Sequence, residues 1–253
     1  MPNDLTGQAI AITGASSGIG EATALACARA GASVALAARR ADRIEALAAR
    51  IEDEGGRAVA LPTDVADERQ ARVFIEHAYE KLGRLDGLIN NAGVMLLGPV
   101  EGADTDEWRR MVDVNVLGLL YCTHAAIPVM KRNEDPAGGH IVNVSSVAGR
   151  HASFGAAVYN FTKWGVCGFS EGLRQEVLHS GIRVTIIEPG FVETELLDHN
   201  TNPMVQAGAK HRKEEIGKVL EADDIANAIV YALAQPPHVS INEVLVRPTG
   251  QRT

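Results

Sequence analysis

A tyrosine and a lysine four positions apart, Tyr159 and Lys163, are the residues of this chain whose types and spacing most directly predict chemistry. In a helix such a pair lies on one face, one turn apart. A phenol with a pKa of about 10 is a poor base near neutrality and needs a nearby cation to stabilise its anion. The pair therefore predicts proton transfer by Tyr159, although an exposed helix face also explains any such pair taken alone.

A glycine-rich segment, Thr13-Gly-Ala-Ser-Ser-Gly-Ile-Gly20, follows the first apolar run of the chain. Glycine lets the backbone turn sharply and approach a pyrophosphate closely, and a helix N-terminus offers free N–H groups to that anion. The spacing of Gly14, Gly18 and Gly20 differs from the general Gly-x-Gly-x-x-Gly fingerprint. The segment predicts a dinucleotide site, and an ordinary turn with a packing glycine is the alternative.

Two arginines, Arg39 and Arg40, follow the second apolar run, where an NAD enzyme is expected to carry an acidic residue for the ribose hydroxyls. Guanidinium groups suit a phosphate instead. The pair therefore favours NADP(H) over NAD(H), and a solvated helix start is the alternative.

Seven apolar runs of strand length alternate with longer amphipathic stretches along the chain. They are Gln8–Thr13, Ser33–Ala37, Ala58–Leu61, Leu85–Asn90, His140–Val144, Arg183–Glu188 and Glu243–Arg247. Most lack polar alternation, which is typical of a parallel sheet covered by helices on both faces. We therefore expect residues 1–253 to form one α/β domain, a doubly wound Rossmann fold with a seven-stranded parallel sheet. Such a sheet binds ligands at the carboxyl ends of its strands.

The order of these motifs, together with Asn90-Asn-Ala-Gly93 after the fourth run and Asn115 in the next helix, resembles the short-chain dehydrogenase/reductase family. The resemblance covers about residues 5–246. It implies a tetrad in which Tyr159 gives or takes the hydroxyl proton and Ser146 hydrogen-bonds the substrate oxygen. Lys163 would hold the nicotinamide ribose and depress the tyrosine pKa, and Asn115 would position a water. Ser145 is the competing serine, but the family's spacing of serine and tyrosine favours Ser146.

The same resemblance implies which residues contact the cofactor, beside the two arginines, Tyr159 and Lys163. The glycine turn supplies Gly14, Ser16, Ser17, Gly18, Ile19 and Gly20; Asp64 and Val65 would contact the adenine; Asn91, Ala92, Gly93 and Val114 the adenosine and ribose; and Pro189, Gly190, Val192 and Thr194 the nicotinamide. A Pro-Gly turn after a strand can expose backbone groups to the carboxamide.

Composition and charge exclude several other classes. The formal net charge is -8 and the basic residues are scattered, so no stripe suited to nucleic acid is expected. No run of roughly 18 apolar residues predicts a membrane span, and the start of the chain has no apolar signal segment, so we expect a cytoplasmic protein. Cys27, Cys122 and Cys167 are expected to be core or interface thiols. Neither they nor the eight histidines have metal-ligand spacing, so no metal site is expected.

The stretch 194–217 is polar and uneven, and it follows a strand. A surface loop with a short helix is one interpretation; a mobile lid over the substrate is favoured by its place at the carboxyl edge of the sheet. His151 and Phe154 either line the substrate pocket or belong to a structural loop. Two long helices, near 104–131 and 154–179, carry more apolar positions than one sheet face covers. We therefore expect a homo-oligomer, and the family resemblance implies a tetramer.

Substrate choice is the least determined property of the sequence. The stretches 95–100, 171–177 and 188–190 are similar to a bacterial reductase of an aldehyde precursor, but substrate loops diverge rapidly. The prediction extends to a small or medium polar carbonyl or alcohol. A non-catalytic NADP sensor would need no Tyr159 or Lys163, and an epimerase or dehydratase of the extended relatives would be expected to have a longer C-terminal substrate domain.

Overall fold

Seven parallel strands form a single sheet in the order β3-β2-β1-β4-β5-β6-β7. The strands are β1 Ala9–Thr13, β2 Ser33–Ala38, β3 Arg57–Pro62, β4 Gly87–Asn90, β5 Gly139–Val144, β6 Ile182–Pro189 and β7 Glu243–Val246. This arrangement, seen in a computed structural model that describes residues 4–134, 137–200 and 203–252, confirms the predicted doubly wound α/β fold. The single-domain prediction for 1–253 stays a prediction, and residues 1–3 and 253 lie outside the described residues.

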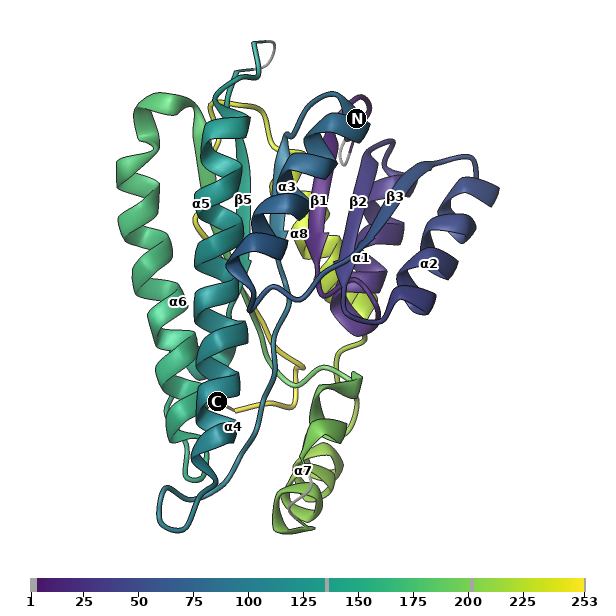
Figure 1. Cartoon of the computed structure of the whole chain (residues 1–253). Coiled ribbons are helices and arrows are strands. Elements are labelled where there is room, and N and C mark those ends of the chain that lie inside the picture. The colour runs from purple at the N-terminus through teal and green to yellow at the C-terminus, as the bar shows by residue number, and fades with distance from the viewer. Residues whose placement is uncertain (1–3, 135–136, 201–202, 253) are drawn as a thin grey trace.

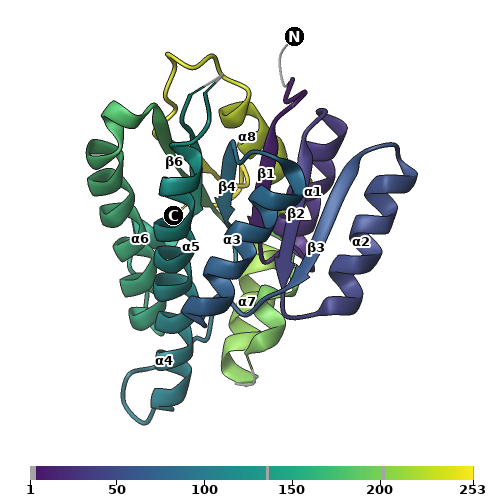
Figure 2. The same ribbon diagram turned by 45° about the horizontal axis from the view of Figure 1, so that its top comes forward.

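Helices cover both faces of the sheet (Figures 1 and 2). One face is covered by α1 Gly18–Arg29, α2 Ala41–Asp53 and α8 Ala222–Leu233, and the other by α3 Glu68–Leu82, α5 Leu119–Met130 and α6 Ala157–Glu176. Local signals fix their ends. The carboxylate of Asp67 accepts a hydrogen bond from the Gln70 backbone N–H at the start of α3, and Gly83 ends this helix in the left-handed region at φ +86°.

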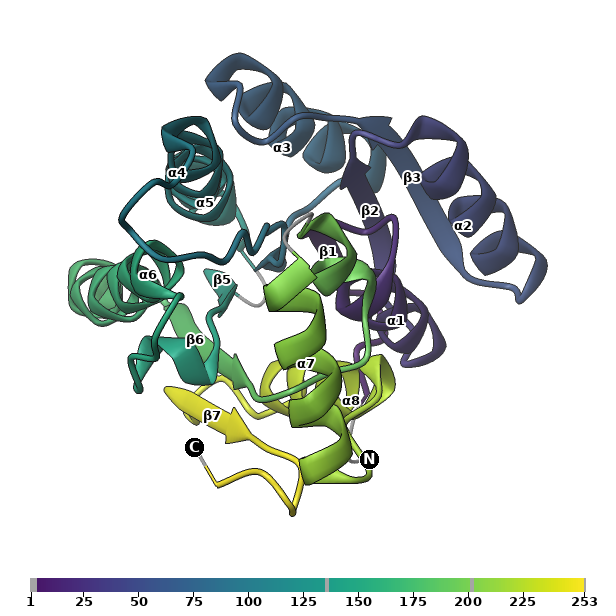
Figure 3. The same ribbon diagram turned by 90° about the horizontal axis from the view of Figure 1, so that it is seen from below.

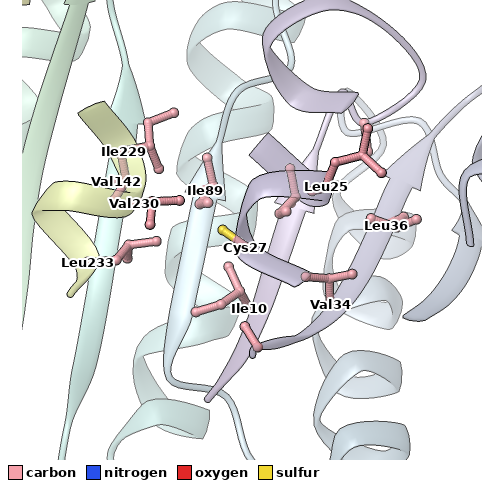
Figure 4. Close-up of a cluster of buried hydrophobic side chains, with 14 of the residues drawn as sticks. Ile10, Leu25, Cys27, Val34, Leu36, Ile89, Val142, Ile229, Val230 and Leu233 are labelled. Carbon is pink, nitrogen blue, oxygen red and sulfur yellow. The ribbon is translucent and has the colours of Figure 1, made fainter. Parts of the chain in front are cut away.

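Side-chain size differs between the two faces of the central strands. Ile10 and Ile12 of β1 point toward α1 and α8, and Ala9 and Ala11 point toward α3 and α5. Strand β2 repeats this pattern. Figure 4 shows the larger side chains packed against Leu25 and Cys27 of α1 and the apolar residues of α8. Burial on both faces explains why these strands are continuous apolar runs in the sequence.

The strand order reverses between β1 and β4. The chain runs outward from β1 to β3 and then returns to place β4 on the other side of β1. In open α/β sheets ligands bind in the crevice at such a switch point, at the carboxyl ends of the strands. The glycine turn follows β1, and Asn91 follows β4, so both predicted cofactor segments lie at this crevice.

The prediction of a single helix near 104–131 is wrong in one respect. The segment consists of α4 Thr105–Val112, a π-helical turn (η1) at Asp113–Gly118, and α5. A π-turn closes its hydrogen bonds between residues i and i+5 and is frequently found at functional sites. Apolar periodicity continues through the turn, so the sequence pattern did not reveal it. The turn carries Asn115.

The segment after β6 forms a short 3₁₀ turn, η4 Glu195–His199, followed by the helix α7 Pro203–Ile216. Figure 3, which views the molecule from below, shows α7 lying across the carboxyl edge of the sheet. The segment thus has the position expected of a lid, and residues 201–202 within it lie outside the described residues.

Candidate functional site

The glycine turn is locked against the loop that follows β4. A Cβ atom on Gly14 would lie 2.8 Å from the Ala92 Cα atom, and one on Gly20 would lie 2.3 Å from the Gly14 carbonyl oxygen. Asn91 Nδ2 donates hydrogen bonds to the carbonyl oxygens of Thr13 (3.0 Å) and Gly14 (3.2 Å). Only glycine therefore fits at positions 14 and 20, and the two loops form one rigid cradle at the switch point.

The N-terminus of α1 opens into this cradle. The Ser17 side chain makes no capping hydrogen bond to the helix; its hydroxyl accepts one from Arg40 Nη2 at 2.7 Å. Uncapped N–H groups at a helix start attract anions such as a pyrophosphate. Ser17, Gly18 and Ile19 line the adjoining cavity. The cradle and the helix start thus fit the phosphates of a dinucleotide.

The two predicted arginines have different surroundings. Arg40 donates to Ser16 Oγ at 2.9 and 3.1 Å and pairs with Glu195 at 2.8 Å. Arg39 is exposed, and within residues 4–134, 137–200 and 203–252 no hydrogen bond or ion pair is recorded for it. Sequence analysis missed Arg43, which lies on α2 within a turn of Arg40 and also pairs with Glu195, at 2.7 Å. The helical spacing of the two arginines was the available signal.

A cavity of about 740 Å³ lies at the carboxyl edge of the sheet, within the size range of small-molecule sites. Its walls bring together many of the predicted residues. They are Ser17, Gly18, Ile19, Asn91, Gly93, Ser146, Tyr159, Lys163, Pro189, Gly190, Val192 and Thr194. His151 and Phe154 also line it, which favours the pocket interpretation of these two residues.

The remaining predicted residues do not line the cavity. They are Gly14, Ser16, Gly20, Arg39, Arg40, Asp64, Val65, Ala92, Val114 and Asn115. Some of them support its walls, as Gly14 and Ala92 do. Asp64 Oδ1 accepts a hydrogen bond from the Ala66 backbone N–H, and Val65 packs against Gly118, so this pair has local structural contacts after β3.

Tyr159 and Lys163 project from one face of α6 into the cavity wall and are each 6% exposed. The Lys163 ammonium lies 5.8 Å from the centroid of the Tyr159 ring and donates to the Val144 carbonyl oxygen at 2.9 Å. The spacing of four residues thus brings phenol and cation together, as the helical pattern predicts.

Burial moves both pKa values away from their ordinary ranges. It raises the pKa of Tyr159 to about 12, and a hydrogen bond with Ser146 opposes this rise. It lowers the pKa of Lys163 to about 8. Removing either group from water disfavours its charged form. The family resemblance implies that Lys163 lowers the pKa of the Tyr159 phenol. The protein environment alone does not lower that pKa below its ordinary value.

The two candidate serines are distinguished by their contacts. Ser145 Oγ donates to the Lys163 carbonyl oxygen at 3.1 Å and lies 3.3 Å from Cys167 Sγ, so it faces the backbone of α6. The Ser146 hydroxyl instead lies beside the phenol of Tyr159, whose pKa it lowers, and donates to the Pro189 carbonyl oxygen at 3.5 Å. The same hydroxyl also accepts from the Ala148 backbone N–H at 3.1 Å. The geometry thus favours Ser146 as the serine beside the reacting oxygen.

Asn115 is 2% exposed and holds the loop that follows β4. Its Oδ1 atom accepts from the Val94 backbone N–H, and its Nδ2 atom donates to the Val94 carbonyl oxygen, both at 2.8 Å. Nδ2 also approaches Thr162 Oγ1, which in turn donates to the carbonyl oxygen of Tyr159. Asn115 therefore links the cavity loop to the helix that carries the phenol.

An ionic network of the buried Glu188 and the exposed Arg150 and Glu243 lies behind the serine wall. The Glu188 carboxylate accepts from Arg150 Nε at 2.6 Å and lies 3.4 Å from Cys167 Sγ, and Arg150 also pairs with Glu243. Glu188 is 1% exposed, and a buried carboxylate is normally paired in this way. Burial raises the pKa of Cys167, and that of Cys27 and Cys122 to about 12, which is consistent with core thiols.

The described part of the candidate lid segment 194–217 lines one side of the cavity with mostly apolar side chains, among them Leu196, Leu197 and Val205. Asn200 fixes its near end. This residue is 3% exposed, accepts from the Leu97 backbone N–H at 2.7 Å and donates to the Met95 carbonyl oxygen at 2.9 Å. The turn before α7 is therefore tied to the loop after β4.

The sequence is similar to those of known oxidoreductases. The short chain dehydrogenase family model matches residues 8–204. An uncharacterized oxidoreductase of Staphylococcus saprophyticus is 41% identical over 98% of this chain and 99% of its own length. Glycine betaine reductase of Emericella nidulans is also 41% identical over 98% of this chain, which spans only 19% of that protein.

Solved structures give the same result. A short chain dehydrogenase from Burkholderia cenocepacia in complex with NADP superposes with a TM-score of 0.84, at 30% identity over 96% of this chain and 97% of that one. A 3-ketoacyl-(acyl-carrier-protein) reductase from Brucella melitensis complexed with NADH gives 0.86, at 30% identity over 97% and 99%. The chain therefore belongs to the short-chain dehydrogenase family of NAD(P)-dependent oxidoreductases.

Proposed function

We propose that this protein is an NADP(H)-dependent oxidoreductase that interconverts a carbonyl compound and an alcohol, with Tyr159 as the proton-transfer group. The observation that carries the proposal is one cavity whose wall holds Tyr159, Ser146 and Lys163 and which adjoins the open N-terminus of α1. Bound nicotinamide would supply or accept the hydride. Solved relatives complexed with NADP support this choice of cofactor, and one complexed with NADH shows that the family uses both.

The chain's own residues fit such a nucleotide. The glycine cradle at Gly14 and Gly20 has no room for a Cβ atom, and the free N–H groups of α1 would hold the pyrophosphate. Arg40, with Ser16 and Ser17, would hold the 2′-phosphate. The remaining contacts implied by the family are proposed unchanged: Asp64 and Val65 for the adenine; Asn91, Ala92, Gly93 and Val114 for the adenosine and ribose; Lys163 for the nicotinamide ribose; and Pro189, Gly190, Val192 and Thr194 for the nicotinamide.

Proton transfer follows from the positions of the side chains. In carbonyl reduction Tyr159 gives its phenol proton to the substrate oxygen, and Ser146 donates a hydrogen bond to the same oxygen as charge develops on it. The protonated Lys163, 5.8 Å from the phenol ring, stabilises the phenolate that remains. Asn115 holds the Val94 loop and the backbone of Tyr159 in place. In alcohol oxidation the same groups act in reverse.

The substrate we propose is a small or medium-sized carbonyl compound. The experiment that tests the function is a titration with NADPH and NADH, followed by the oxidation of bound NADPH in a panel of aldehydes and ketones. Turnover supports the oxidoreductase. Tight NADPH binding without turnover of any carbonyl or alcohol would point instead to a sensor, and the absence of binding would reject both.

Arg40→Ala is expected to weaken NADPH binding by about tenfold or more, because a charge-assisted hydrogen bond contributes about 1.5 to 3 kcal/mol. NADH, which has no 2′-phosphate, should lose much less affinity. The measurement is the dissociation constant of each nucleotide by fluorescence titration. Arg39→Ala is the matched control and should have the smaller effect, because Arg39 is exposed and does not lie on Ser16 and Ser17. An equal loss for both nucleotides in Arg40→Ala would contradict a phosphate-specific role.

We also propose a homo-oligomer, a tetramer by family analogy. Phe161, Trp164 and Leu178 are 66%, 52% and 59% exposed along and just after α6. The helical run Thr105–Met130 is apolar enough to span a membrane by length and composition, yet only 39% of its most apolar window is buried. A second copy would cover this surface. Light scattering at micromolar concentration should therefore give a multiple of 26.9 kDa, and a monomer would overturn the proposal.

We place the protein in the cytoplasm.

A further inference from the structure

One carboxylate is shared by two arginines at the edge of the proposed phosphate site. Glu195 is the first residue of η4, and its two oxygens accept from Arg40 Nη1 at 2.8 Å and Arg43 Nη1 at 2.7 Å. The arginines come from the start of α2, more than 150 positions earlier in the sequence. The pairing therefore joins the lid segment to the element that follows β2.

The carboxylate lies beside the glycine turn. Arg40 holds Ser16 and Ser17 with the same guanidinium group that pairs with Glu195. Thr194, the residue before Glu195, lies against the turn itself, because a Cβ atom on Gly18 would be 3.1 Å from its Cγ2 atom. An anion held by Arg40 at this turn thus meets the Glu195 carboxylate.

The neighbouring charges determine how Glu195 competes with another anion for Arg40 and Arg43. Glu195 is the one carboxylate recorded within ion-pair distance of Arg40 among the described residues. Arg43 has Glu21 and Asp42 in its field as well. Hydrogen bonds from the two arginines lower the pKa of Glu195 to about 2, so it is ionised at every pH at which the protein would work. Its competition with another anion is therefore permanent.

We infer that Glu195 is a specificity-determining residue that competes with the 2′-phosphate of the nucleotide for Arg40 and Arg43. This inference rests on the proposed NADP(H) function. The arginines alone would favour NADPH strongly, and the carboxylate reduces this preference because the phosphate must displace it or share its donors. Displacement also removes the ion pairs that hold η4 to α2, so a 2′-phosphate loosens η4.

The test is Glu195→Gln, which keeps the shape of the side chain and removes its charge. Surface ion pairs are weak, but the donors that the carboxylate occupies become available to the phosphate, so NADPH and adenosine 2′,5′-bisphosphate should bind about threefold to tenfold more tightly. NADH and 5′-AMP should bind as they do to the unaltered protein. The measurement is calorimetric or fluorescence titration at low salt, and the gain should shrink at high salt.

Glu193→Gln is the matched control. Glu193 lies on the same segment and pairs with Lys213 of α7 rather than with the arginines. Its variant should leave the ratio of NADPH to NADH affinity unchanged. An unchanged or lower ratio in Glu195→Gln would overturn the inference while leaving the proposed function intact. If the unaltered protein binds neither nucleotide, the proposed function itself fails.

Hydrogen exchange gives a readout independent of affinity. In the unaltered protein, adenosine 2′,5′-bisphosphate should speed exchange in peptides covering 195–199, because it has no nicotinamide to replace the lost contacts. Addition of 5′-AMP should not do so. In Glu195→Gln the exchange should be fast before any nucleotide is added. Protection of these peptides by the bisphosphate in the unaltered protein would overturn the inference.

Discussion

Tyr159→Phe is expected to lower kcat by about 10² to 10⁴-fold and to leave NADPH binding unchanged, because positioned acid–base groups contribute about this much to a rate. The substitution removes only the hydroxyl. The ring, which is 6% exposed and packs with Val94 and Met111, keeps its place. The measurement is steady-state turnover of any carbonyl compound that the panel identifies, together with a nucleotide titration.

Two controls make this result specific. Ser146→Ala should lose less activity than Tyr159→Phe, because the serine contributes a hydrogen bond and not the proton. Ser145→Ala should change turnover least, because Ser145 faces the backbone of α6. Normal turnover by Tyr159→Phe would reject the mechanism. A crystal structure in which the phenol points out of the nicotinamide site would reject it as well.

Turnover in the unaltered protein is expected to fall as the pH rises through about 8. Burial lowers the pKa of Lys163 from its ordinary 10.5 to about 8, so the ammonium beside the phenol loses its proton in that range. An opposite charge within about 4 to 6 Å shifts a pKa by about one to three units. Lys163→Met should accordingly lose about tenfold to a thousandfold in kcat and should show no fall near pH 8.

The free energy of unfolding should rise over the same pH range in which turnover falls. This difference separates the loss of activity from unfolding. Between pH 8 and 10.5 the unfolded chain holds a proton on Lys163 that the folded chain has released, so the contribution of this residue to the free energy of unfolding rises with pH. Tyr159 acts against stability only above pH 10, where the unfolded phenol ionises before the buried one does. Denaturant titrations of the unaltered protein and of Lys163→Met measure the difference. An alkaline fall in kcat that persists in Lys163→Met would show that another group causes it.

The strands were predictable because a parallel sheet buried on both faces leaves uninterrupted apolar runs. The largest discrepancy is β4, which begins at Gly87 rather than at the predicted Leu85. Asp86 marks the boundary. Its carboxylate accepts from the Ala9 backbone N–H and from Arg84, and its own backbone N–H and carbonyl oxygen already bond to Ala9 and His140, so pairing with the neighbouring strands begins one residue before the strand itself.

The parts of the site that depend on spacing within one short segment were predictable. The parts that depend on packing between distant segments were not. Spacing placed Tyr159 and Lys163 on one face of a helix, and the structure agrees. It could not give their pKa values, which depend on burial by distant elements. Adjacent arginines gave no indication that only Arg40 turns toward the glycine segment. Nor could any local pattern pair Arg40 with Glu195, since the contact exists only after the sheet has formed.

The π-turn before α5 has a consequence for how this chain tolerates changes in length. A ring closed between residues i and i+5 holds one residue more than the α-helical ring. The surplus residue is absorbed within Asp113–Gly118, between the end of α4 and the start of α5. A deletion of one residue here would convert the wide turn into an ordinary one without rotating the packed faces of its neighbours. The deletion would break the two hydrogen bonds between Asn115 and Val94, which hold the loop at the edge of the cavity.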